Sequence, residues 1–288
     1  MTPLAAALVL LATPPAPPAQ QANDAHEATP IVWQPIGPGA ARATLASEGG
    51  TAIELMRFDL DRFRVEVVVG NGQPPQARTA AELRRNRGAV ATVNGGFFDE
   101  RVVPLGLRIA DGEQRFPLRP KADWGVLILA GHRARIVHTR EYPARLPAQT
   151  GQAGQAGSGD ERIDGAIQVG PRLLVGGVPT KLRPQLARRT AVAVDGAGTT
   201  LALAVVPDAV DANELAGRLA SAGFTDAMLL DGGPSTQASL ELGEAHLEVN
   251  GAYPVPDLLA VFPRPAHRKV NTPSPAATPS TTREPRHP

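Results

Sequence analysis

The 288-residue chain contains no cysteine, and only 4% of its residues are aromatic. The first absence excludes disulfide bonds, metal sites built from thiolates and a cysteine nucleophile. The second leaves few flat side chains for stacking on a ligand ring, so specificity must come mainly from polar contacts. A hydrophobic fraction of 42% and a charged fraction of 20% are typical of a globular chain with an ample core.

The chain also lacks an excess of charge of either sign. Its formal net charge is +1, but residues 264–288 carry five basic residues against Glu284 alone, which leaves a net −3 on the rest. No basic field covers the body of the chain, so we expect no nucleic-acid partner.

Several sequence motifs with a known chemistry are missing. There is no HExxH, HxH, EF-hand, GxSxG or Walker pattern, and the six histidines are scattered along the chain. These absences count against a zinc peptidase, an α/β-hydrolase and a P-loop enzyme, and they leave the residues of any metal site unknown.

The ends of the chain differ in composition from its body. Residues 1–22, MTPLAAALVLLATPPAPPAQQA, join an apolar run to small residues and prolines, as a signal peptide does, although no Lys or Arg precedes the run. We therefore expect a secreted, periplasmic or cell-envelope protein, with no transmembrane span after removal of the signal.

Three further segments have the composition of unstructured chain. Residues 23–30 are expected to form a linker, residues 147–161 a flexible loop, and residues 264–288 a disordered basic tail rich in Pro, Ser and Thr. The folded domain is then residues 31–263.

Two parts of this domain show the same order of predicted elements. TAIELMRFDLDRFRVEVVV predicts a hairpin, TAAELRRNRG a helix from Thr79 to Gly88, and GAVATV a buried strand. The second part repeats a hairpin around Asp195-Gly196, a helix from Asp211 to Gly223 and the strand DAMLL. We predict an α+β fold of two similar strand-strand-helix-strand halves packed into one domain with disordered ends, the alternative being chance repetition of common elements.

Each half ends in a glycine pair, Asn94-Gly95-Gly96 in the first and Asp231-Gly232-Gly233 in the second. If the two halves pack about a pseudo-two-fold axis, these equivalent loops lie near one another. Glycine permits positive φ and lets a ligand approach bare N–H groups, which can cradle an anion. Asp231 could act as general acid, general base or nucleophile. Two ordinary tight turns are the alternative interpretation.

Side chains near the second loop could complete an anion site. Ser235 offers a hydroxyl donor, and Arg189 and Thr190 open the strand RTAVAVD, where an arginine could bind phosphate through two hydrogen bonds. The alternative is a turn cap for Ser235 and a solvated strand end for Arg189, as we expect for its neighbour Arg188.

Five stretches in sequence order resemble the successive blocks of the phosphodiester glycosidase family, bacterial branch, over about residues 50–262. They are NGGFFD, PLGLRIADGE (104–113), AIQVGPRLLVGG (166–177), RTAVAVD (189–195) and AMLLDGGPSTQASL (227–240). The resemblance implies hydrolysis of a sugar 1-phosphodiester between the anomeric carbon and the phosphate oxygen.

The resemblance also assigns residues to the site. It makes Asp231, Asn94 and Arg189 catalytic. It places these residues at the substrate: Gly95, Gly96, Gln168, Thr190, Gly232, Gly233 and Ser235. No cofactor is established by it, and a divalent cation such as calcium is left open.

Two departures from the family pattern concern phosphate binding. Pro234 stands where glycine is usual and lacks an N–H donor. Val255-Pro256-Asp257 stands where an arginine before the last strand is common. No second catalytic carboxylate is obvious, and the candidates Asp99, Asp164 and Asp195 suit turns or loops better.

Three functions follow. The first is a hydrolase that cleaves the glycosidic bond of sugar 1-phosphodiesters in cell-surface or extracellular glycans. The alternative is a non-catalytic envelope protein that binds phosphate-containing polysaccharide, with the basic tail on anionic wall polymer. The third is a phosphodiesterase that cuts the other phosphoester bond.

Overall fold

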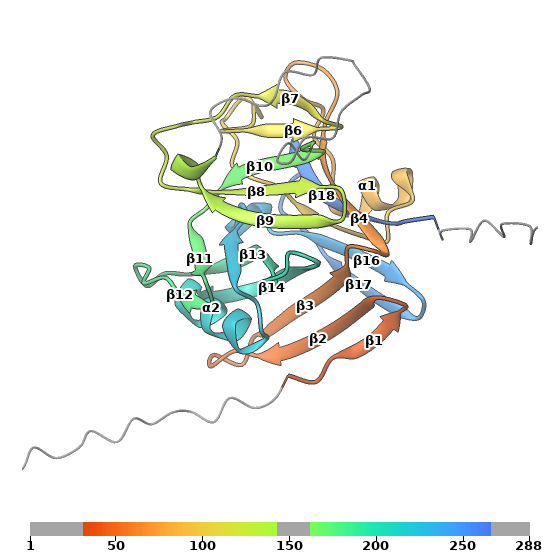
Figure 1. Cartoon of the computed structure of the whole chain (residues 1–288), viewed down its shortest axis with the longest axis vertical. Helices are drawn as coiled ribbons and strands as arrows, with labels where there is room; N and C mark the ends of the chain where they lie inside the picture. Colours follow the sequence, from red (N-terminus) through yellow and green to blue (C-terminus); the bar gives the residue numbers. More distant parts are fainter. Residues whose placement is uncertain (1–30, 143–161, 266–288) are drawn as a thin grey trace, which may run out of the picture. The chain divides into compact units, whose positions relative to one another are not determined.

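The computed structural model describes residues 31–142 and 162–265 (Figure 1). The predicted signal peptide, the linker 23–30, the loop 147–161 and the tail after Pro265 lie outside the described residues. The chain divides into Met1–Pro30 and Ile31–Pro288, and only the second unit is described below. Within its described ranges, no helix has the length and apolar character needed to cross a membrane.

Three antiparallel sheets make up this unit. The eight-stranded sheet has the order β1 (Gln34–Gly37), β2 (Ala40–Ala46), β3 (Ala52–Asp59), β14 (Thr200–Asp211), β13 (Leu186–Val194), β15 (Asp226–Leu229), β11 (Arg172–Val175) and β12 (Val178–Pro179). The β10 sheet has the order β7 (Glu113–Phe116), β6 (Arg108–Ala110), β10 (Gly165–Val169), β8 (Gly125–Ala130) and β9 (Arg133–His138). The β5 sheet has the order β17 (Ala245–Val249), β16 (Ala238–Leu242), β5 (Ala91–Asn94), β18 (Asp257–Pro263) and β4 (Phe63–Val69).

Two α-helices occur among the described residues, and both begin at the caps expected from the sequence. In α1 (Ala80–Arg87), the Thr79 hydroxyl accepts from the Glu82 N–H, the Glu82 carboxylate accepts from the Thr79 N–H, and Gly88 ends the helix at φ 67°. In α2 (Ala212–Ser221), Asp211 accepts from the Asn213 N–H at 2.8 Å. The 3-10 helices are η1 (Thr139–Glu141) and η2 (Gly233–Ser235).

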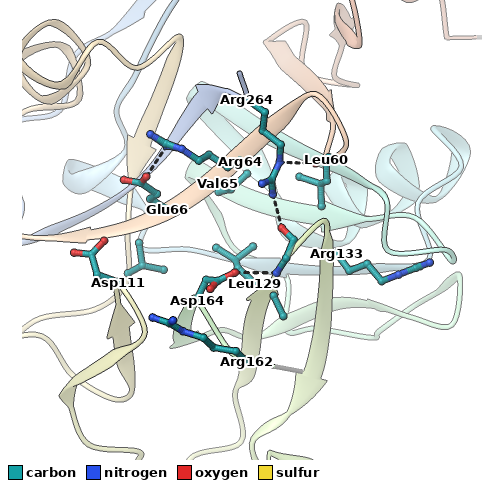
Figure 2. A pocket seen from close by; sticks show the side chains of 13 residues that line it. Leu60, Arg64, Val65, Glu66, Asp111, Leu129, Arg133, Arg162, Asp164 and Arg264 are labelled. Carbon is teal, nitrogen blue, oxygen red and sulfur yellow. Dashed lines mark hydrogen bonds and ion pairs between the residues drawn. The ribbon is translucent and has the colours of Figure 1, made fainter. Parts of the chain in front are cut away.

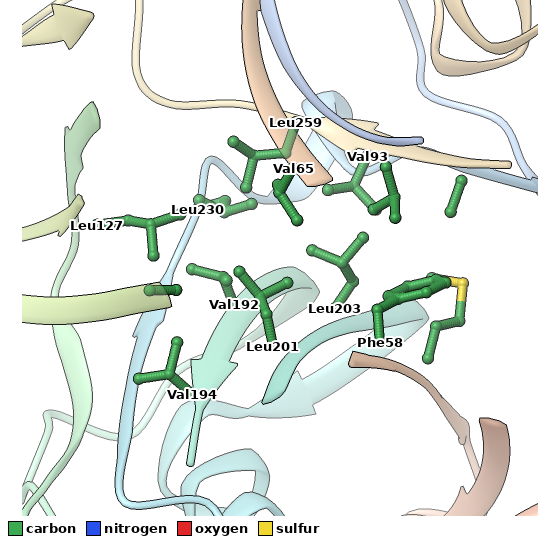
Figure 3. Packing of buried hydrophobic residues seen from close by; sticks show 14 of the residues in the cluster. Phe58, Val65, Val93, Leu127, Val192, Val194, Leu201, Leu203, Leu230 and Leu259 are labelled. Atoms are coloured by element: carbon green, nitrogen blue, oxygen red, sulfur yellow. The ribbon is translucent and has the colours of Figure 1, made fainter. Parts of the chain in front are cut away.

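The main core lies where the three sheets face one another (Figure 3). Alternate residues of β13 and β14 face this core, because successive side chains of a strand point to opposite faces of the sheet. On β14, Leu201, Leu203 and Val205 enter the main core, while the alternate small residues Ala202 and Ala204 face a second core with α2. Large side chains therefore fill the space between sheets, and small ones let the helix pack closely.

The predicted α+β fold class is wrong, because the described unit is mostly β. The two helices are only 8 and 10 residues long. Between them the chain folds into short antiparallel strands, such as β6 and β7 around the Asp111-Gly112 turn, that the sequence analysis left unassigned. Antiparallel strands need only a short turn to connect them, so one chain of this length holds many.

The two halves keep the predicted order of elements but are not equivalent in space. The second half forms its hairpin, β13 paired with β14, and β15 joins the same sheet. The predicted first hairpin does not form, because β3 pairs with β2 and β14 while β4 pairs with β18 in another sheet. The main core of Figure 3 explains the split, since Phe58 of β3 and Val65 of β4 enter it from two different sheets.

Candidate active site

The loops after β5 and β15 meet, as the matched glycine pairs predicted. The N–H of Asp231 donates to the carbonyl of Gly95 at 2.9 Å, and the Asn94 side-chain amide donates to the carbonyl of Asp231 at 2.7 Å. Two segments 137 residues apart are thus joined directly by backbone and side-chain bonds.

The Asn94 side chain is fully buried and uses all of its hydrogen-bonding capacity within the protein. Besides its bond to Asp231, its amide donates to the carbonyl of Gly95 at 3.3 Å. Its oxygen accepts from the Thr190 hydroxyl at 2.7 Å and from the N–H of Gln237 at 3.1 Å. An asparagine has two N–H donors and two acceptor positions, so a contact with a ligand would require one of these bonds to break.

Gly95 and Gly96 are needed for close packing rather than for positive φ. Neither lies in the left-handed region. A side-chain carbon at Gly95 would overlap the Asp257 carboxylate, and one at Gly96 would overlap the Arg108 guanidinium. Their N–H groups are also occupied, that of Gly95 by the Asp257 carbonyl at 2.9 Å and that of Gly96 by the Asp257 carboxylate at 2.8 Å.

A buried ion pair therefore lies directly against the first loop. Arg108 Nε is 3.0 Å from Asp257 Oδ2, and both side chains have no exposed surface. Arg108 also donates to the carbonyls of Leu107 and Gln168 at 3.0 Å and to that of Phe97 at 3.2 Å. Neither residue was predicted to belong to the site, although each begins an apolar strand, where an unexplained charge is a signal in itself.

Asp231 is half-buried, and burial raises the pKa of its carboxyl above the usual range of aspartate. The nearby charge of Asp257 raises it further. The Ser235 hydroxyl, the Gly232 N–H at 2.9 Å and the charge of Arg108 act in the opposite direction. Burial also raises the pKa of Asp257, which Arg108 and the Gly96 N–H oppose. Asp231 is the carboxylate of this group that retains partial exposure.

The second loop continues into the 3-10 helix η2. Gly233 has φ 57°, in the left-handed region, and its N–H has no acceptor among the described residues. Pro234 stands at the start of this helix, where a missing N–H costs little, and its carbonyl accepts from Ala252 at 2.8 Å. The Ser235 hydroxyl is buried and lies 3.5 Å from the Tyr253 hydroxyl.

Gln168 is fully buried beneath the site. Its oxygen accepts from the N–H groups of Leu107 and Arg119, and its amide donates to the Arg119 carbonyl and the Thr139 hydroxyl, all at 2.9 to 3.1 Å. These bonds connect β10 to three segments beside its sheet, which are Leu107 before β6, Arg119 after β7 and Thr139 after β9. Like Asn94, Gln168 has its polar groups occupied by protein.

The backbone of Arg189 lies opposite that of Asp231, because β13 pairs with β15 as Ala191 with Leu229 and the Leu230 N–H donates to the Thr190 carbonyl at 2.8 Å. The guanidinium of Arg189 nevertheless is not among the charges that shift the pKa of Asp231.

Arg189 pairs across β13 and β14 with Val206, which belongs to the core beside α2, whereas Thr190 pairs with Val205 in the main core. Arg189 donates to the Gln185 carbonyl at 2.6 Å, and burial lowers the pKa of its guanidinium while the charge of Asp211 opposes this. Neighbouring residues of a strand face opposite ways, so the side chains of Arg189 and Thr190 lie on opposite faces of the sheet.

Arg188 is the arginine of this strand that reaches the second loop. Its guanidinium donates to the carbonyls of Thr236 at 3.1 Å and Asn250 at 2.8 Å. The sequence analysis treated Arg188 as a solvated strand end, although it stands two residues from Thr190 and hence on the same face.

Two aromatic pairs flank the first loop. The rings of Phe97 and Trp124 have centroids 5.1 Å apart, and those of Phe98 and Tyr253 are 6.1 Å apart, both edge to face. Tyr253 is 42% exposed and so offers an accessible ring and hydroxyl beside Ser235. Four of the eleven aromatic residues of the chain thus lie beside this loop, and Tyr253 is the exposed one among them.

A cavity of about 340 Å³ lies elsewhere, along β4 (Figure 2). Arg64, Arg133, Arg162 and Arg264 line it together with Glu66, Asp111 and Asp164, and none of the predicted site residues takes part. Arg264 donates to the carbonyls of Leu60 and Gly131 there, so it is tied to the fold. In the described residues no group of three or more His, Asp or Glu side chains is placed to hold a metal ion.

The fold and the two joined loops are those of a known family. The model of the phosphodiester glycosidase family matches residues 87–262, and the chain belongs to that family. No curated protein matches the chain.

Solved structures share the fold at low identity. The catalytic domain of zebrafish N-acetylglucosamine-1-phosphodiester alpha-N-acetylglucosaminidase, auto-inhibited by its pro-peptide, has a TM-score of 0.57 at 17% identity, covering 83% of this chain and 90% of that one. A hypothetical protein from Synechocystis has a TM-score of 0.56 at 15% identity, and the match covers 83% of this chain and 64% of the Synechocystis chain. A protein from Burkholderia pseudomallei has a TM-score of 0.51 at 15% identity, and the match covers 77% of this chain and 74% of the Burkholderia chain. The chain thus spans less than two thirds of the Synechocystis protein.

We expect Gly95→Ala to lower the free energy of unfolding by about 2 kcal/mol or more, since the new methyl group would overlap the Asp257 carboxylate. Urea unfolding followed by tryptophan fluorescence measures the change. The matched control is Gly217→Ala in α2, where nothing lies within 4 Å and the stability should rise by about 0.5 to 1 kcal/mol. Equal stability of Gly95→Ala and the parent would contradict the packing account.

Proposed function

We propose that the chain is a hydrolase that cleaves the glycosidic bond of sugar 1-phosphodiesters, with Asp231 as its catalytic carboxylate. Membership of the phosphodiester glycosidase family supports this class of reaction. The zebrafish protein with a similar fold is named as an enzyme acting on a sugar 1-phosphodiester. We extend the class of bond to this chain and leave its sugar unassigned.

One observation supports the choice of leaving group. Asp231 and Asp257 are the carboxylates bonded at the two glycine loops, and Asp257 is 1% exposed and paired with Arg108. Most glycosidases flank the bond with two carboxyl groups, one of which protonates an alcohol leaving group. A phosphate group leaves without such help, so one accessible carboxylate suffices for a sugar phosphodiester.

In the proposed reaction Asp231 acts as general base. It takes a proton from a water molecule while the water oxygen bonds to the anomeric carbon. The bond between that carbon and the phosphate oxygen breaks, and its electron pair leaves with the phosphate. The products are a free sugar and a phosphomonoester. The raised pKa of Asp231 makes the carboxylate a stronger base than an ordinary aspartate.

We also propose where the substrate is found. The signal-peptide pattern of residues 1–22 and the basic residues of 264–288 favour a phosphate-containing glycan of the cell surface or of the extracellular space. Because a divalent cation was left open, the activity assay below is run with and without added calcium.

The alternative, a non-catalytic envelope protein that binds such a glycan, is favoured by one feature of the site. The guanidinium groups of Arg108 and Arg188 are bonded to Asp257 and to backbone carbonyls. The phosphate would then rely on neutral donors such as the Tyr253 hydroxyl and the Gly233 N–H, which bind it less strongly than a free arginine would.

We expect Asp231→Asn to lower kcat by at least about 100-fold while leaving the affinity for substrate nearly unchanged, because the amide keeps the shape and loses the base. The assay follows sugar released from UDP-N-acetylglucosamine and from a synthetic sugar 1-phosphodiester, with and without calcium. Asp208→Asn, an exposed carboxylate on β14, is the control and should match the parent. Binding without turnover in both the parent and Asp231→Asn would favour the binding protein.

A second expectation concerns the leaving group. We expect turnover of a sugar 1-phosphodiester, and turnover of the methyl glycoside of the same sugar lower by at least about 1000-fold, since Asp231 acts as the base and Asp257, the other carboxylate bonded at the loops, is too buried to protonate an alcohol. The rate should also fall at acidic pH, starting above the usual titration range of aspartate, as Asp231 becomes protonated. Equal rates on the two substrates would mean that another group serves as the acid.

A further inference from the structure

The buried pair of Arg108 and Asp257 has no part in the reaction as proposed, since neither side chain has any exposed surface to offer a substrate. Burying two charges removes both from water, and a well-packed apolar pair of similar volume often serves stability equally well. Stability alone therefore does not explain why two charges are buried here.

Its nearest neighbours lead directly to Asp231. The Asp257 carboxylate accepts from the N–H of Gly96 at 2.8 Å, and the Asp257 carbonyl accepts from the N–H of Gly95 at 2.9 Å. The carbonyl of Gly95 in turn accepts from the N–H of Asp231 at 2.9 Å. One residue thus holds both glycines of the first loop, and the first loop holds the backbone of Asp231.

Arg108 contacts the next residues of the same loop. Its guanidinium donates to the carbonyl of Phe97 at 3.2 Å, directly after Gly96. A side-chain carbon on Gly96 would overlap that guanidinium, so the backbone lies in contact with it. The loop from Gly95 to Phe97 is thus held by hydrogen bonds to Asp257 of β18 and Arg108 of β6.

We propose, on the basis of the proposed function, that Asp257 and Arg108 are positioning residues for Asp231. They fix the loop that orients the Asp231 backbone, and they place a charge of each sign close to the Asp231 carboxylate. Neither residue touches the substrate.

The two charges act on Asp231 in opposite directions. The negative charge of Asp257 raises the pKa of Asp231 and the positive charge of Arg108 lowers it. The other groups that face Asp231 are the Ser235 hydroxyl and the Gly232 N–H, which lower its pKa. Two further cations stand near the loop on β13: Arg188, bonded to the carbonyls of Thr236 and Asn250, and Arg189, opposite Asp231 in the strand pairing and bonded to the Gln185 carbonyl. Loss of Asp257 alone should lower the pKa of Asp231, whereas loss of both charges should change it little.

The test compares Asp257→Asn with the double variant Arg108→Met and Asp257→Asn in the full chain. The asparagine keeps an oxygen for the N–H of Gly96, and the double variant leaves no unpaired buried charge, so it should fold even where the single variant does not. Arg84→Met is the matched control, because Arg84 is another buried arginine, bonded to Ser239 and Glu241 away from the loops.

Two quantities are measured. The first is the carboxyl ¹³C NMR titration of Asp231, assigned by comparison with Asp231→Asn, which needs no turnover. The second is the pH dependence of kcat and KM on the synthetic sugar 1-phosphodiester. Absence of turnover in the parent would count against the proposed function, while the NMR titration would still decide the electrostatic part of this proposal.

We expect Asp231 to titrate at lower pH in Asp257→Asn and near the parent value in the double variant. We expect kcat to fall by about 10-fold or more in both, with KM less affected, since small displacements of a catalytic group are costly. Arg84→Met should change neither quantity. An unchanged titration in a folded Asp257→Asn, or a parent-like kcat in a folded double variant, would overturn the proposal.

Discussion

The ion pair of Arg108 and Asp257 is the constraint around which the site is built. It joins β6 of one sheet to β18 of another at 3.0 Å with no solvent contact, and it occupies the N–H groups and the space beside Gly95 and Gly96. An unpaired charge in such a position would be far more costly than an apolar residue, so each partner makes the other necessary. The first glycine loop is thereby fixed, and through it the backbone of Asp231.

The polar residues around the loops divide into two groups. Asn94 and Gln168 are buried and fully bonded to protein, and they connect segments that are distant in sequence. Asp231 and Tyr253 form the outer group, in which Asp231 is half-buried and Tyr253 is 42% exposed, while the buried Ser235 hydroxyl lies 3.5 Å from the Tyr253 hydroxyl. The buried group determines where the outer group stands, and the outer group is what a substrate would meet. A glycosidase with one accessible carboxylate fits a leaving group that needs no proton.

Features that depend on residues close together in the sequence were predicted correctly, whereas the pairing of strands and side chains distant in the sequence was not. The capping box at Thr79 and the turn at Asp195 were predicted and found, because these bonds lie within a few residues. The β3–β4 hairpin was predicted and is absent, because alternation defines a strand's faces but not its neighbour. The meeting of the two loops followed from the matched motifs. Arg189 and Thr190 were predicted to belong to one site, and the structure places their side chains on opposite faces of β13. The Arg108–Asp257 pair was missed because nothing local connects residues 149 positions apart.

The most direct test of the central claim is a double-mutant cycle on the free energy of unfolding, with Arg108→Met, Asp257→Asn and both together. A pair that anchors the site predicts a loss of about 3 kcal/mol or more for each single change and a clearly smaller combined loss than their sum, with a coupling of about 2 kcal/mol or more. Additive losses would contradict the account, since they would show that the two charges stabilise the fold independently.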